Sequence, residues 1–324
     1  MKQKNPSYYS NQKSQKKISN KWRKIFIFNF DPKNDEIAQT FLSKKIKDLL
    51  KKNKDEILCI FASKFNLNTI LKTLDKVLKP KNGYIISDNG ACLYDIGNKK
   101  IIYECPLKQE AKTTLIHEAL LNSFLILLSS KTKCFSYSID INKYKKFMNS
   151  FDVNNKLIEN YLTFWHYIHE NEFHSFVFYE SNNFTLLKKY KIFKSLESNL
   201  NVNFSSIENN MFCVSNNDSS ILKTYLKVLD LLKDTINIEK TYYFVLNSFD
   251  NNFWNIFSKN HYMNISYLTS NRDSLKIEIA PKDIFLADNI SKIISASINK
   301  PTFNKIHSIL NIEKEFVNLE NKNH

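Results

Sequence analysis

Short apolar runs alternate with segments of helical periodicity in the first part of the chain. Apolar, strand-forming residues occupy Ile25 to Phe30, Ile57 to Phe61 and Tyr84 to Ser87, with a continuity typical of strands buried on both faces. The two segments between these runs, residues 35–50 and 67–78, place their apolar residues at helical spacing. This β-α-β-α-β order predicts an α/β fold in which helices cover a parallel sheet.

The pattern changes after Asn89. Two short strand-like runs flank Gly97 and Asn98 and predict an antiparallel hairpin. Strand candidates then alternate with long helical stretches as far as Leu268, and the style of the first domain returns from Leu275. We therefore predict the following organisation: a tail at residues 1–23, a discontinuous core at 24–98 and 269–324, and an inserted α/β domain, the cap, at 99–268.

Composition and charge indicate a globular body with a basic tail. Apolar residues make up 43% of the 324 residues, enough for a sizeable buried core. The formal net charge is +15, and the first 24 residues carry eight of the 47 Lys and Arg but no acidic residue. Such a segment is typical of a disordered, solvated tail, and weak contact with nucleic acid or an anionic surface is the alternative.

Cysteine and hydropathy patterns favour the cytoplasm. The five cysteines are odd in number, lie far apart and show no C-x-x-C spacing, which is typical of buried thiols in a reducing compartment. The early sequence has no apolar stretch of the kind that forms a secretory signal. The longest apolar segment, Leu115 to Leu128, contains polar residues that disfavour a membrane span. The histidines within residues 166–174 lack zinc-site spacing, so we interpret them as packing residues.

Three segments resemble motifs of a known family. The first strand ends in "NFDPK" (residues 29–33), where the family has D-x-D-G-T, and "IISDNGACLYD" (residues 85–95) is similar to the family's I-x-x-N-G-A-x-x-Y-D. "EIAP" (residues 278–281) matches its E-I-x-P. In this order the motifs resemble the Cof-type branch of the haloacid dehalogenase-like (HAD) phosphatases. The resemblance implies a Rossmann-like core with a large inserted cap, over Lys24 to about Leu319.

The resemblance assigns roles to individual positions. Asn29 stands at the position of the nucleophilic aspartate, Asp31 keeps the acid/base position, and Ser63 occupies the phosphate-binding hydroxyl position. Asn89 and Lys282 are further candidates for phosphate binding. The family's Lys, five residues after the Pro of E-I-x-P, is replaced here by Leu286, and the acids that hold Mg²⁺ in relatives are missing after Leu310, where Glu313 is the nearest acid.

These replacements predict a degenerate HAD protein. A carboxamide is a poor nucleophile and cannot form an aspartyl phosphate, so phosphatase activity is expected to be lost while a phosphorylated ligand or a protein partner is still bound. No metal site and no cofactor are expected, with Mg²⁺ relevant only to residual activity. Two alternatives stay open: a working phosphohydrolase on small phosphorylated metabolites that uses Asp31 or a rearranged site, and a nucleic-acid-associated protein acting through its basic tail.

Overall fold

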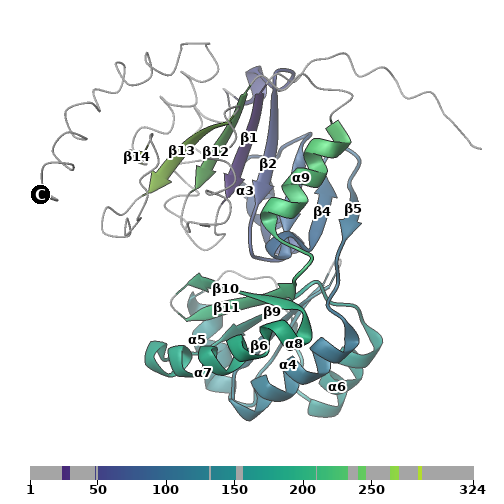
Figure 1. Ribbon diagram of the computed structural model, residues 1–324, viewed down its shortest axis with the longest axis vertical. Coiled ribbons are helices and arrows are strands. Elements are labelled where there is room, and N and C mark those ends of the chain that lie inside the picture. The colour runs from purple at the N-terminus through teal and green to yellow at the C-terminus, as the bar shows by residue number, and fades with distance from the viewer. Residues whose placement is uncertain are drawn as a thin grey trace, which may run out of the picture.

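The computed structural model describes residues 24–29, 48, 50–130, 133–150, 156–208, 210–232, 240–245, 263–269 and 284–286. Within this part of the chain the strands form an eight-stranded sheet, the core sheet, and a six-stranded sheet, the cap sheet. Figure 1 shows the core sheet above the cap sheet. The predicted tail at residues 1–23 lies outside the described residues.

The core sheet is mostly parallel. From edge to edge it consists of β14 (Ile284–Leu286), β13 (Met263–Thr269), β12 (Lys240–Val245), β1 (Lys24–Asn29), β2 (Ile57–Ala62), β3 (Tyr84–Ser87), β4 (Cys92–Asp95) and β5 (Lys100–Glu104). The strands from β14 to β3 are parallel, and β4 and β5 are joined antiparallel as the predicted hairpin. The predicted α/β fold with a parallel sheet is thereby confirmed.

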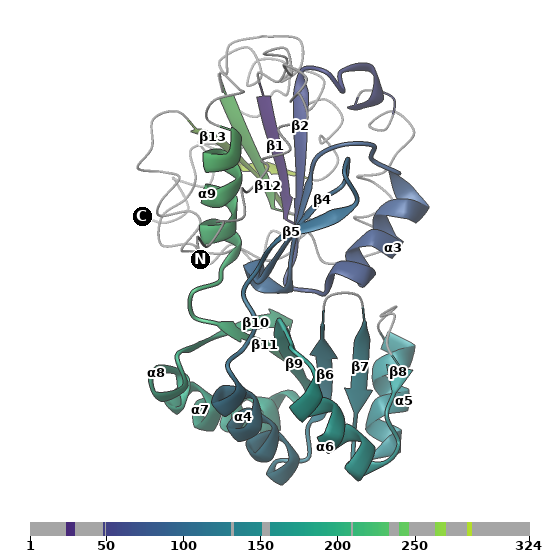
Figure 2. The same ribbon diagram turned by 90° about the vertical axis from the view of Figure 1, so that its right-hand side faces the viewer.

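Helices cover both faces of the core sheet. Figure 2 shows α9 (Ile221–Leu232) and α3 (Leu67–Val77) on opposite sides of the strands. The fully buried Tyr225 of α9 packs in a cluster with apolar residues of β1, β2 and β3. Helix α3 begins at Asn66, whose side-chain oxygen accepts a hydrogen bond of 3.0 Å from the backbone N–H of Thr69, as expected of an N-cap.

The cap sheet is mostly antiparallel. In spatial order it contains β10 (Val202–Glu208), β11 (Met211–Asn216), β9 (Ser175–Tyr179), β6 (Leu125–Ser129), β7 (Cys134–Tyr137) and β8 (Lys156–Leu157). The cap helices are α4 (Gln109–Leu121), α5 (Ile141–Ser150), α6 (Tyr161–Glu170), α7 (Asn183–Ser195) and α8 (Glu197–Leu200). Among the helices that the structure describes, none combines the length and apolar character needed to cross a bilayer.

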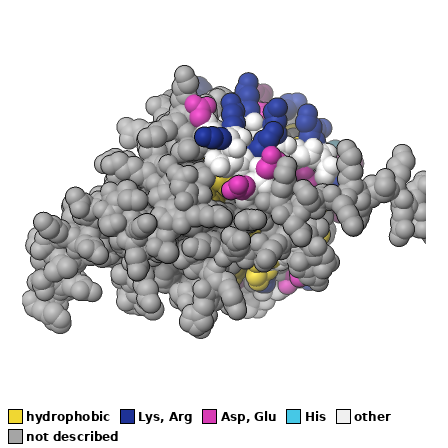
Figure 3. Space-filling view, turned by 90° about the horizontal axis from the view of Figure 1, so that it is seen from above, with side chains coloured by type: hydrophobic (Ala, Val, Ile, Leu, Met, Phe, Trp, Pro, Cys, Tyr) yellow, Lys and Arg dark blue, Asp and Glu magenta, His cyan; other side chains and the backbone are white. Residues whose placement is uncertain are grey.

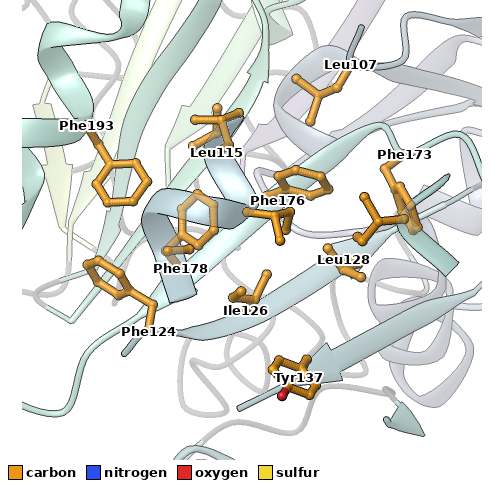
Figure 4. Close-up of a cluster of buried hydrophobic side chains, with 14 of the residues drawn as sticks. Leu107, Leu115, Phe124, Ile126, Leu128, Tyr137, Phe173, Phe176, Phe178 and Phe193 are labelled. Atoms are coloured by element: carbon orange, nitrogen blue, oxygen red, sulfur yellow. The ribbon is translucent and has the colours of Figure 1, made fainter. Parts of the chain in front are cut away.

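The two faces of the cap sheet are buried differently. One face packs against α4, α6 and α7 through an aromatic cluster that includes Phe124, Phe176, Phe178 and Phe193 (Figure 4). Neighbouring rings in this cluster lie 5.2–6.1 Å apart, the range in which aromatic pairs attract. The other face packs against α5 and against Phe65, which belongs to the core. This second face therefore connects the cap to the core.

The predicted domain boundaries need correction. Residues 99–268 were expected to form the cap, but β5, β12 and β13 lie in this range and belong to the core sheet. Helix α9 lies in the same range and packs on β1 and β2. The cap sheet itself extends only from Leu125 to Asn216. The error has a physical cause: an apolar run shows that a strand is buried but does not show which strand lies beside it.

Candidate functional site

A buried carboxamide lies at the end of β1. Asn29 is the last residue of this strand and is 5% exposed. It is in register with Ala62 of β2 on one side and with Val245 of β12 on the other. Because these strands are parallel, their carboxyl ends share one edge of the sheet, and this edge faces the cap in Figures 1 and 2. Open α/β sheets bind their ligands at this edge.

Ser63 lies beside this position because it directly follows Ala62. Its backbone N–H donates to the carbonyl oxygen of Ile86 on β3 at 3.0 Å, which continues the pairing of β2 with β3 by one residue. Its hydroxyl oxygen accepts a hydrogen bond of 3.1 Å from the backbone N–H of Phe65. Ser63 is 1% exposed, so the short loop after β2 holds its hydroxyl in a fixed, buried place.

The chain makes a left-handed turn directly after β3. Asp88, Asn89 and Gly90 have φ angles of 54°, 54° and 92°. Non-glycine residues rarely adopt positive φ, and Asn and Asp tolerate it better than most. The backbone N–H of Asn89 donates to the Ser63 carbonyl oxygen at 3.4 Å. The turn thus brings the predicted residues Ser63 and Asn89 together.

The cap contacts this turn through serine hydroxyls. The Asn89 side-chain amide donates to the Ser215 hydroxyl of β11 at 3.1 Å, and the Ser175 hydroxyl of β9 donates to the Asp88 carboxylate at 2.8 Å. Ser215 and Ser175 are paired across β11 and β9, so they form one row of the cap sheet. Two neighbouring serine hydroxyls of the cap sheet therefore form hydrogen bonds with the turn that contains Asp88 and Asn89.

The Asp88 carboxyl group is enclosed at this contact. It has no exposed surface, and the Ser87 hydroxyl donates to its second oxygen at 2.9 Å. Burial raises the pKa of Asp88 above its ordinary value, while the charge of His174 and the hydrogen bonds from serine hydroxyls oppose that rise. His174 is itself 2% exposed, and its Nε2 lies 2.8 Å from Glu104 Oε1.

The structure brings together part of the predicted site. Asn29, Ser63 and Asn89 lie at the carboxyl edge of adjoining parallel strands, as the motifs indicated. Asp31 and Lys282 lie outside the described residues. Leu286, at the position where the family has Lys, is the last residue of β14, three strands from β1 in the core sheet. The roles proposed for these residues stay predictions.

Sequence reasoning missed the residues that join this site to the cap. Asp88 lies inside the motif that was recognised, and an acid between an apolar strand and Asn-Gly was a usable signal. Ser175 and Ser215 carried none, because isolated Ser residues near strands are common. His174 lies in the histidine-containing segment that was interpreted as packing residues. The relevance of these three residues depends on contacts between segments 70 to 126 residues apart.

The described residues do not by themselves fit the Mg²⁺ that the fold family implies. Mg²⁺ is bound mainly through carboxylate oxygens and waters, and Asn29 offers a neutral carboxamide oxygen in their place. Within the part of the chain that is described, no group of three or more His, Cys, Asp or Glu side chains is arranged to hold a metal ion.

Comparison with known proteins defines the class of fold. No protein-family model and no curated protein matches the sequence. Solved structures do match, and several of them are haloacid dehalogenase-like hydrolases or phosphatases of the HAD superfamily. This chain shares their fold, which confirms the HAD-like fold that the motifs predicted.

Three of the matching structures illustrate the likeness. A protein of Thermotoga maritima matches with a TM-score of 0.67 and 15% identity, covering 87% of this chain and 98% of its own. A haloacid dehalogenase-like hydrolase from B. subtilis matches with a TM-score of 0.62 and 12% identity, covering 84% and 99%. A HAD subclass IIB sugar phosphatase matches with a TM-score of 0.59 and 13% identity, covering 84% and 98%. At these identities the likeness concerns the fold.

Proposed function

We propose that this protein binds a small phosphorylated molecule at the carboxyl edge of the core sheet and does not hydrolyse it. The observation that carries the proposal is the buried Asn29 at the end of β1, in register with the residue that precedes Ser63. A HAD phosphatase needs a carboxylate at this position to attack phosphorus, and a carboxamide cannot form the acyl phosphate. A neutral amide also removes one negative charge that would repel a bound phosphate.

The loops around Asn29 supply groups that suit a phosphate. The Ser63 hydroxyl accepts its one hydrogen bond from Phe65, so its own hydrogen has no acceptor among the described residues and is available to a phosphate oxygen. The side-chain amide of Asn89 donates one hydrogen to the Ser215 hydroxyl, and its second hydrogen can be donated to a phosphate oxygen. Donors of this kind, held in place before the ligand arrives, favour an anion without requiring catalysis.

The first rival is a phosphohydrolase that uses Asp31 as its nucleophile. Asp31 lies two residues beyond Asn29, a shift that keeps the side chain on the same face if the strand pattern continues. Such an enzyme would turn over sugar or nucleotide phosphates, and Asp31→Ala would abolish that turnover.

The second rival is a nucleic-acid-associated protein. Figure 3 shows Lys and Arg side chains gathered on the described part of the face seen from above, the end of the core away from the cap. The exposed Lys51, Lys52, Lys54, Lys79 and Lys81 precede β2 and β3 at this amino-terminal edge. Binding through such a face would weaken steeply with salt and would not depend on Ser63.

A phosphatase assay tests the loss of catalysis. Wild type, Asn29→Asp and Asp31→Ala are compared with Mg²⁺ over a panel of sugar and nucleotide phosphates. Loss of a nucleophile alone lowers a rate by roughly 10⁴ to 10⁶, yet we expect Asn29→Asp to stay almost inactive because Leu286 replaces the family's Lys. Turnover by wild type contradicts the proposal, whereas turnover that appears only in Asn29→Asp shows that the rest of the site is intact and contradicts the expectation drawn from Leu286.

A binding assay tests the site separately. Inorganic phosphate and the same panel of phosphates should raise the melting temperature of wild type, because a ligand at 100 times its Kd stabilises by about 2.7 kcal/mol. Ser63→Ala should weaken this effect, whereas Ser195→Ala, at an exposed position of α7, should leave it unchanged. If the ligand raises the melting temperature of both variants equally, it binds at another site.

A further inference from the structure

A buried acid, histidine and acid meet where the cap contacts the core. Asp88 Oδ2 lies 4.0 Å from His174 Nδ1, and His174 Nε2 lies 2.8 Å from Glu104 Oε1. The side chains of His174 and Asp88 are 2% and 1% exposed, and that of Glu104 is 26% exposed. These groups lie beside Asn89 but take no part in the proposed binding of phosphate.

The cluster joins the two domains. Asp88 and Glu104 come from the core, in the turn after β3 and at the end of β5. His174 directly precedes the cap strand β9, and Ser175 is the first residue of that strand. Asn89, in the same core turn as Asp88, is 3% exposed at this contact, and its side-chain amide donates to the cap residue Ser215. Separation of cap and core would break these contacts and expose the turn to water.

The geometry fixes the number of protons in the cluster. His174 Nε2 serves the contact with Glu104, and Nδ1 is buried without a hydrogen-bond partner among the described residues. A neutral imidazole that donates from Nε2 presents a lone pair at Nδ1. That lone pair would face an ionised Asp88 inside the protein, which is unfavourable. One additional proton removes the conflict, either on the Asp88 carboxyl group or on Nδ1.

We propose that docking of the cap onto the core takes up one proton, which Asp88 and His174 hold between them. The docked state is then favoured at acidic pH and loosens as the pH rises. When the domains separate, Asp88 regains contact with water and releases this proton. Burial raises the pKa of Asp88, and a raised pKa stabilises the docked state at low pH and ceases to do so as the pH increases.

Other titratable groups near the cluster do not supply this proton. Burial raises the pKa of the Cys213 thiol on β11 to about 12 and raises that of Cys134 on β7 as well, so both remain neutral thiols at neutral pH. Lys64, in the loop after β2, carries a positive charge that opposes the rise in the pKa of the Cys213 thiol. Glu104 remains paired with His174 Nε2 whether or not Asp88 and His174 hold the additional proton.

Hydrogen exchange of the full-length protein tests the proposal. The protection factor of the segment containing Asp88 and Asn89, whose backbone N–H groups are buried at this contact, is measured from about pH 5.5 to about pH 8.5 and corrected for intrinsic exchange. In wild type it should fall as the pH rises, by at most tenfold per pH unit for one proton. Protection within β6, which pairs on both sides inside the cap sheet, should not follow this slope.

Variants distinguish the effect of the bound proton from the effect of the contacts between cap and core. In Asp88→Asn the carboxamide can donate to Nδ1 without taking up a proton, and Asn tolerates the left-handed backbone at this position, so protection should persist and its pH slope should vanish. Glu110→Gln, at an exposed position in the first turn of α4, should keep the wild-type slope. Should Asp88→Asn fail to fold, Asp88→Gly, which also lacks a titratable side chain and suits the left-handed backbone, replaces it and should also lose the slope. Flat protection in wild type, or a slope that survives in the variant, overturns the proposal.

Discussion

Replacement of Gly90 by alanine should destabilise the protein because no room exists for a side chain in the turn after β3. Gly90 has a φ of 92°, and an added Cβ would lie 2.6 Å from the backbone nitrogen of Ile221 and closer still to the Ser220 carbonyl group. The neighbour is therefore backbone at the start of α9, not a flexible side chain. This part of α9 is also held to the turn, because the Thr224 hydroxyl donates to the Gly90 carbonyl oxygen at 2.6 Å.

The size of the effect follows from two unfavourable contributions and one favourable one. A left-handed conformation costs a residue with a Cβ about 1–2 kcal/mol. Overpacking against fixed atoms adds about 1–3 kcal/mol. The alanine also restricts the unfolded chain, which increases the free energy of unfolding by about 0.4–1 kcal/mol. We expect a net loss of about 2–4 kcal/mol in the free energy of unfolding, or a melting temperature lower by about 3–6 °C.

Gly97 provides the matched control. It lies in the β4–β5 turn, and its φ is outside the left-handed region. The nearest atom to an added Cβ would be Asp95 Oδ1 at 3.4 Å, which is an ordinary contact. Gly97→Ala should change the stability by less than about 1 kcal/mol. Urea and thermal unfolding of both variants, followed by circular dichroism, make the comparison. Similar stabilities for Gly90→Ala and Gly97→Ala would refute the argument from close approach.

Two further predictions concern other parts of the molecule. Glu180 accepts hydrogen bonds from Lys143 at 3.1 Å and from Lys189 at 2.7 Å. Glu180→Gln should cost about 3–5 kcal/mol, because it leaves the buried Lys143 and the half-buried Lys189 without their counterion. Glu170→Gln, at an exposed pair, should cost less than about 1 kcal/mol. Burial raises the pKa of Glu180, but hydrogen bonds from Lys189 and Lys143 and their charges lower it overall. Its contribution is thus present above the pKa of an unfolded Glu, about 4.3, and the gap between wild type and Glu180→Gln should narrow as the pH falls below that value. Removal of residues 1–23, which lack an apolar face, should leave the melting temperature unchanged within a few degrees, and a larger drop would show that this segment packs on the body.

Much of the core could be predicted from the sequence. The runs that became β1, β2 and β3 are continuously apolar, and such runs form buried parallel strands wherever helices can cover both faces. Once the strands are parallel, the residues that follow them must lie at one edge. The positions of Asn29, Ser63 and Asn89 at that edge therefore followed from local pattern together with one recognisable motif.

The tertiary structure alone decided which strands became neighbours and which polar groups became buried. The run that forms β12 has the same character as a cap strand, and only its pairing with β1 assigns it to the core. His174 and Glu104 are 70 residues apart, and Ser215 and Asn89 are 126 residues apart. Local periodicity reports whether a side chain is buried, because burial depends on the residue's own hydrophobicity. The partner of a buried polar group depends on the path of the whole chain, so the contact between cap and core could be found only in the folded molecule.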